Sequence, residues 1–81
     1  MQHAYDEILD FVTSGPSLDQ IADFTYSVAT LERLAYLLDH EALGFLNDGE
    51  REELAEFRKC DAFMDQLRIR AQRRLSELQN A

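Results

Sequence analysis

Very little in this sequence interrupts a helix or crosslinks the chain. A lone cysteine, Cys60, excludes an intrachain disulfide and agrees with a reducing compartment. One proline and three glycines leave long uninterrupted stretches, which favours helices. No apolar run approaches the roughly 20 residues that a membrane-spanning helix needs, and the start, MQHAYDEILDF, lacks the pattern of an export signal. We therefore expect a soluble, cytoplasmic protein.

Basic residues are also scarce, and they are unevenly placed. Eight Lys and Arg stand against 16 Asp and Glu, for a net charge of −8. Residues 1–57 hold 13 acids and two bases, a charge of −11, whereas residues 58–81 hold six bases and three acids, a charge of +3. An acidic body repels phosphate backbones and attracts basic surfaces, so binding of nucleic acid by the bulk of the chain is disfavoured.

The apolar spacing predicts a single helical domain over residues 1–81, since no segment alternates with period two. A first helix is expected over about 3–13, with an apolar face made by Tyr5, Ile8, Leu9 and Val12, and Gly15-Pro16 ends it. Ser17 and Gln20 form a capping box that opens a short helix. The brief β-prone stretch 24–26 is interpreted as a connector.

Two further helices follow the connector. Ser27 can cap a helix of about 28–42, whose apolar stripe is Leu31, Leu34, Ala35, Leu38 and Ala42. The longest pattern predicts one helix from about 48 to 78, with apolar residues at Leu54, Phe57, Cys60, Met64, Leu67, Ala71, Leu75 and Leu78. The expected fold is therefore all-α: a helical hairpin with a long C-terminal helix, plus one or two short N-terminal helices.

The length of the last helix carries a functional expectation. At 1.5 Å per residue it reaches about 45 Å, whereas the helix before it spans about 24 Å. The end of the long helix should therefore keep an open apolar seam, formed by Leu67, Ala71, Leu75 and Leu78. An uncovered apolar stripe usually marks an interface, so we expect a homodimer or docking onto a different protein.

The segment from Asp39 to Glu50 raises the question of a calcium-binding loop. Laid against the twelve-residue loop of EF-hands, Gly44 falls on the glycine position and Glu50 on the last ligand. Position 5, which should supply an oxygen ligand, is Leu43. A turn explains more residues, because Gly44 can end one helix while Asn47 caps the next with Glu50.

Other candidate chemistry is weak. His3 is expected at a frayed terminus, and His40 lies at a helix end, where an imidazole favours the carbonyl-rich terminus and is usually solvated. Cys60 sits on the apolar stripe, so it is expected to behave as a small buried hydrophobe. No Glu-x-x-His pair suggests a di-metal site. We expect no cofactor and no metal, and we do not expect an enzyme.

Two charged features remain as candidate binding surfaces. An acidic corner is formed by Glu50, Glu52, Glu53 and Glu56, with Asp39, Glu41 and Asp48 nearby. It is either solvated surface or a docking site for a basic partner. The second feature is an arginine cluster, Arg68, Arg70, Arg73 and Arg74. These arginines either complement the helix dipole and pair with acids, or they contact phosphate.

Three elements of the chain carry a recognisable pattern of residues. They are Ala29, Thr30, Glu32, Arg33, Leu37 and Leu38 in one element, Gly44, Leu46, Glu50, Glu53 and Leu54 in the next, and Leu67, Arg70 and Ala71 in the last. With these residues the chain resembles a family of small uncharacterised bacterial proteins that are frequent in cyanobacteria. The sequence departs from the pattern at Asn47, Arg51 and Ala62, which take the places of a capping Thr, a Glu and a His.

The resemblance implies an antitoxin-type partner protein and carries no catalytic residue. The leading hypothesis is therefore an interaction module that neutralises or regulates a basic partner such as a toxin or nuclease. The alternative is a dimeric DNA-binding regulator that presents its arginine cluster to DNA.

Overall fold

The computed structural model describes residues 3–80, which form four helices and no strand. The helices are α1 (His3–Thr13), α2 (Leu18–Ala22), α3 (Val28–Ala42) and α4 (Asp48–Gln79). The predicted all-α class and the long C-terminal helix are confirmed. Within this part of the chain, no helix is both long and apolar enough to cross a membrane.

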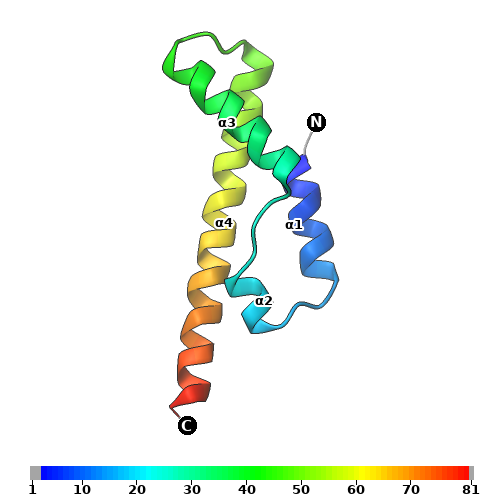
Figure 1. Cartoon of the computed structure of the whole chain (residues 1–81), viewed down its shortest axis with the longest axis vertical. Coiled ribbons are helices and arrows are strands. Elements are labelled where there is room, and N and C mark those ends of the chain that lie inside the picture. The colour runs from blue at the N-terminus through cyan, green and yellow to red at the C-terminus, as the bar shows by residue number, and fades with distance from the viewer. Residues whose placement is uncertain (1–2, 81) are drawn as a thin grey trace.

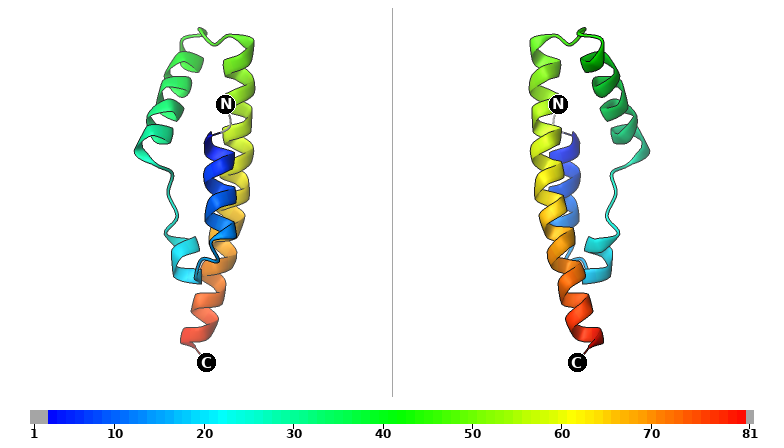
Figure 2. Two further views of the ribbon diagram at one scale, coloured as in Figure 1. Left: turned by 90° about the vertical axis from the view of Figure 1, so that its right-hand side faces the viewer. Right: turned by 90° about the vertical axis from the view of Figure 1, so that its left-hand side faces the viewer.

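The three shorter helices all pack against α4, which runs the length of the molecule (Figure 1). Its 32 residues correspond to about 48 Å, and the longest dimension of the chain is 52 Å. Helix α1 runs in the same direction as α4, α2 lies against the C-terminal half of α4, and a connector then returns to the start of α3 (Figure 2). Helices α3 and α4 form the predicted hairpin.

Each expected cap is present. The Ser17 hydroxyl accepts a hydrogen bond from the Gln20 backbone, at 3.2 Å, while the Gln20 side chain accepts one from the Ser17 backbone, at 2.9 Å. Asn47 and Glu50 repeat this capping box at the start of α4, with distances of 2.8 and 3.1 Å. Ser27 caps α3 through the Thr30 backbone N–H. These local bonds explain why sequence spacing placed the helix starts correctly.

The segment between α3 and α4 is a turn, as the sequence indicated. Gly44 has φ of 75°, a left-handed conformation that glycine adopts without strain. Its N–H donates to the Glu41 carbonyl, at 3.0 Å, and the Phe45 N–H donates to the His40 carbonyl, at 2.9 Å. This pair of bonds is the Schellman ending of a helix. Leu46 is buried, which anchors the turn to the core.

The core lies where α1, the connector and α3 meet the first two thirds of α4. Its buried members are Ala4, Ile8, Tyr26, Leu37, Leu46, Leu54, Phe57, Cys60 and Met64. A chain of aromatic contacts crosses it, from Phe11 to Phe24 (4.6 Å between ring centroids), from Phe24 to Tyr26 (5.4 Å) and from Tyr26 to Phe57 (6.3 Å). The connector is therefore part of the core, although it has no regular secondary structure.

The open apolar seam predicted at the end of α4 is wrong for three of its four residues. Ala71 is only 2% exposed, and Leu67 is half-buried and packs on the core. Leu75 is also half-buried, and only Leu78 is largely exposed, at 67%. The reason is α2, which the Gly15-Pro16 turn brings back against the C-terminal half of α4 (Figure 1).

The apolar stripe predicted on α3 is largely solvent-exposed rather than packed. Leu31 and Leu38 are 42% and 43% exposed, and Ala35 and Ala42 are exposed as well. Of the predicted stripe, Leu34 alone is half-buried and packs on the core, and the buried residues of α3 are Thr30 and Leu37. The predicted stripe and the buried face are neighbouring faces of α3. Contact with α4 determines which of the two is buried.

Candidate protein-binding surface

The four carboxylates of the acidic corner do not share one environment. Glu53 receives two hydrogen bonds from Arg33 of α3, each of 2.8 Å, and this pairing raises the pKa of Arg33. Glu50 lies 4.0 Å from the same guanidinium and also completes the cap of α4. These two carboxylates are therefore engaged within the chain, whereas Glu52 and Glu56 face outward.

Glu52 and Glu56 are the more available members of the corner. Glu56 is half-buried and has a 3.4 Å ion pair with Lys59, one helical turn away. Glu52 is exposed and has no ion-pair or hydrogen-bond partner within residues 3–80. The other nearby acids are mostly neutralised: Glu41 forms a bidentate pair with Arg58, at 2.7 and 3.0 Å, which lowers the pKa of Glu41.

A groove of about 1010 Å³ opens between α1, the start of α3 and the first half of α4. Six carboxylates line it, and we call it the acidic groove: Asp6, Glu7, Asp10, Glu52, Glu53 and Glu56. Its only lining cations in the described part of the chain are Arg33 and Lys59, both already paired with glutamates. The groove therefore carries a clear excess of negative charge.

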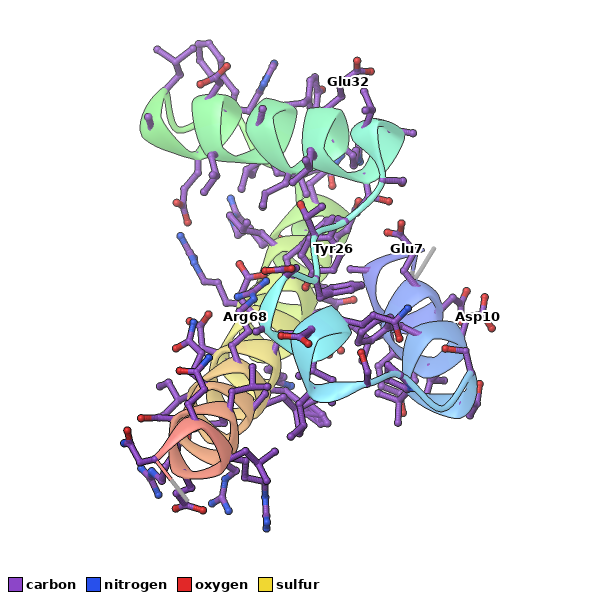
Figure 3. All side chains as sticks on the ribbon, turned by 60° about the horizontal axis from the view of Figure 1, so that its bottom comes forward. Glu7, Asp10, Tyr26, Glu32 and Arg68 are labelled. Carbon is purple, nitrogen blue, oxygen red and sulfur yellow. The ribbon has the colours of Figure 1, made fainter. Side chains whose placement is uncertain are left out.

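Helix α1 supplies the wall of the groove that sequence reasoning missed. The Glu7 carboxylate accepts a hydrogen bond from the Ser27 backbone N–H, at 2.8 Å, and so ties α1 to the start of α3. Figure 3 shows Glu7 directed toward that helix start and Asp10 turned outward. Asp6 and Asp10 are exposed, with no ion-pair partner in residues 3–80. No local sequence signal predicts that α1 lies near Glu52, because the two are far apart in the sequence and meet only where α1 packs on α4.

The apolar part of the groove comes from small and aromatic side chains. Ala29 and Ala55 face it from α3 and α4, and Tyr5, 47% exposed, faces it from α1. On the neighbouring turn of α3, the Arg33 guanidinium lies 4.9 Å above the Tyr36 ring, which stacks on His40. These contacts help to hold Arg33 in place beside Glu53.

The arginine cluster is divided in the structure. Arg68 bonds both Asp65, at 2.8 Å, and the Phe24 carbonyl, at 3.1 Å, so it fastens the connector to α4 (Figure 3). Arg70, Arg73 and Arg74 are exposed, and none has an acidic partner in the described chain. Only these three arginines are available for binding.

The remaining candidates are structural. Cys60 is buried, and burial raises the pKa of its thiol, so it stays protonated as the packing interpretation expects. The His40 ring Nδ1 lies 2.8 Å from the Tyr36 carbonyl. Helix α1 begins at His3, whose side chain lies outside the described residues. Over the described chain, no group of three or more His, Cys, Asp or Glu could hold a metal ion.

Comparisons of the chain with protein families, with characterised proteins and with solved structures find no significant match. The resemblance to small bacterial antitoxin-type proteins therefore stays a prediction.

Proposed function

We propose that this protein is a non-enzymatic interaction module, acting in the cytoplasm, that holds a basic segment of a partner protein in the acidic groove. The observation that carries the proposal is the convergence of Asp6, Asp10 and Glu52 on one groove from two different helices. None of these carboxylates has an ion-pair partner within residues 3–80, so each is free to meet a cation. Together they favour a lysine- or arginine-rich partner and repel an acidic one.

The geometry also indicates what kind of basic segment fits. The groove combines outward carboxylates with the exposed ring of Tyr5 and two alanines, Ala29 and Ala55. An amphipathic segment could place its cations on the rim and its apolar side chains on this surface. A nuclease-like toxin, the partner implied by the family resemblance, would present such a basic surface, and neutralising it is the corresponding role.

The proposal can be tested with a lysine- and leucine-rich amphipathic peptide, labelled for fluorescence anisotropy. We expect binding that weakens as salt rises, and a glutamate-and-leucine peptide of the same length should not bind. The variant D6N/D10N should weaken binding roughly three- to tenfold, since two rim charges are lost. The matched control D19N/D23N changes the charge equally, at exposed acids outside the groove. Equal losses in both variants would contradict the proposed site.

A second candidate function is supported by the free arginines at the end of α4. Arg70, Arg73 and Arg74 are exposed near the C-terminal end of α4, and such unpaired guanidinium groups suit phosphate oxygens. A gel-shift assay with duplex DNA at low salt tests this function. Loss of the shift in R70Q/R73Q/R74Q would support DNA binding, and absence of any shift with the native chain would remove it.

A further inference from the structure

One exposed line of residues along α4 has symmetric spacing. Its members are Glu52, Glu56, Phe63, Arg70 and Arg74. At 100° per residue, all five point within about 20° of the direction of Phe63. Phe63 is 47% exposed, Glu56 is half-buried, and the other three are exposed. We call this line the charged stripe.

The two halves of the charged stripe mirror each other with opposite charge. Glu56 and Arg70 each lie seven residues from Phe63, and Glu52 and Arg74 each lie eleven residues from it. These separations correspond to about 10 and 16 Å along the helix axis. A second α4 placed antiparallel, with the two Phe63 rings opposite each other, would therefore bring Arg70 against Glu56 and Arg74 against Glu52, twice in the pair.

We propose that this chain forms a closed, two-fold antiparallel dimer through the charged stripe, with Phe63 at the symmetry axis. The same surface is used by both copies, as in an isologous interface. Antiparallel pairing also places Lys59 opposite Leu67, whose surface the Lys59 stem can cover. No like charges face each other along the stripe.

The charges needed for this pairing are not consumed inside the chain. Glu52, Arg70 and Arg74 have no ion-pair partner in residues 3–80. Glu56 has only the exposed pair with Lys59, at 3.4 Å, and such a contact contributes little and is readily exchanged. The charged stripe can therefore pair with the same stripe of a second copy, and three of its four charges have no ion-pair partner within residues 3–80.

The shape of the single chain agrees with a missing partner. Its radius of gyration is 15.1 Å, whereas a compact chain of this length has about 12 Å. It exposes 5835 Å², about 800 Å² more than scaling gives for a compact protein of this mass. That excess equals about one side of a standard interface.

The exposed apolar surface of α3 fits a second copy less well. On α3, Leu31 and Leu38 are flanked by Glu32 and Asp39, two exposed acids without an ion-pair partner in the described residues. Antiparallel pairing of two α3 helices would set these acids against each other. Charge complementarity therefore favours α4 over α3 as the self-association surface.

The dimer does not depend on the proposed function, but the two share Glu52 and Glu56. A second copy and a basic partner would compete for these carboxylates. Self-association would then shield the acidic groove until a basic partner displaces the second copy.

Sedimentation equilibrium on the full chain tests the inference. We expect a mass of twice 9.4 kDa for the native protein, with no larger species as concentration rises. The variants E52R/E56R and R70E/R74E should each dissociate at least about tenfold more readily, because every pair across the interface becomes repulsive. Mixed together, the two variants should restore a dimer, since all their facing charges are then opposite.

The matched control is E32R/D39R, which changes the net charge as much as E52R/E56R but lies on α3. It should stay dimeric, and circular dichroism should show native helicity in every variant. A monomeric native chain, a dimer insensitive to both reversals, a mixture that stays monomeric, or open-ended growth would each overturn the inference. Whether the groove binds the peptide at all is tested separately by D6N/D10N, so failure of the dimer and failure of the proposed site can be distinguished.

Discussion

Tyr26 and Asp61 are joined by a hydrogen bond, 3.0 Å from the Tyr26 hydroxyl to the Asp61 carboxylate, that fastens the connector to α4. Tyr26 is only 7% exposed, and its ring lies between Phe24 and Phe57 in the aromatic chain. With Arg68 bonded to the Phe24 carbonyl, this contact determines how α1 and α3 sit on α4. The position of the acidic groove therefore depends on the connector.

Removing the Tyr26 hydroxyl should destabilise the fold measurably. We expect Y26F to lower the free energy of unfolding by about 1 to 2 kcal/mol, because a hydrogen bond to a charged group is lost while the ring remains. Urea denaturation followed by circular dichroism measures the change. Y36F is the control, since Tyr36 is 41% exposed and its hydroxyl has no hydrogen-bond partner in the described chain. Equal effects would contradict the role given to the connector.

The same residue gives the protein a specific response to alkaline pH. Burial, and then the hydrogen bond to Asp61, raise the pKa of Tyr26 above its usual range. Tyr26 contributes fully to the free energy of unfolding below about pH 10, the pKa of tyrosine in the unfolded chain. This contribution is lost as pH rises toward the higher pKa of Tyr26 in the folded chain, by up to about 1.4 kcal/mol per pH unit. The stability advantage of the native chain over Y26F should therefore shrink above pH 10. A constant difference would contradict this sign.

The two bidentate ion pairs between α3 and α4 should differ in strength. Arg33 and Glu53 are 40% and 20% exposed, whereas Arg58 and Glu41 are 58% and 43% exposed. Double-mutant cycles with alanine should give a coupling of about 0.5 to 1 kcal/mol for the first pair. The second pair should show a smaller value, because water screens it more. A larger coupling between Arg58 and Glu41 would show that exposure does not control these pairs.

Two glycines should respond to alanine in opposite directions. Gly44 has a positive φ, 75°, so G44A should cost about 1 kcal/mol through backbone strain, although its Cβ would meet no atom within 4 Å. Gly49 lies in the first turn of α4, where an added Cβ would meet only Asn47 Oδ1, at 3.5 Å. G49A should therefore stabilise the chain by up to about 1 kcal/mol. Thermal unfolding of both variants distinguishes the two signs.

Competition between a basic partner and a second copy predicts a gain in binding. R70Q/R74Q should bind the lysine-and-leucine peptide more tightly than the native chain, because its carboxylates are no longer covered in a dimer. The control R51Q/R73Q changes the net charge equally but lies away from the centre of the charged stripe. Anisotropy titrations at one protein concentration compare them. An equal gain in both would assign the effect to net charge alone.

The helices could be predicted from the sequence because their signals are local. Ser17, Ser27 and Asn47 cap helices through bonds to residues three positions away, and Gly44 ends α3 through its own backbone conformation. The distribution of apolar surface is not local. Ala71 is buried and Leu31 is exposed because of the positions in which α2 and α3 pack on α4. The sequence of a single helix does not determine those positions.

The same distinction applies to the candidate site. Glu52 and Glu56 could be identified from the sequence, since they lie in one acidic run. The sequence could not show which of these glutamates are paired within the chain, because Arg33 contacts Glu53 only through the packing of α3 on α4. Asp6 and Asp10 join the groove only through the parallel packing of α1 on α4.

The central claim is that a basic segment binds in the acidic groove, and NMR titration of the labelled chain with the lysine-and-leucine peptide tests it most directly. We expect the largest amide shift changes around Asp6, Asp10, Ala29 and Glu52, which line the groove. Changes confined to the outer face of α3, around Leu31 and Leu38, or no saturable changes at all, would contradict the claim.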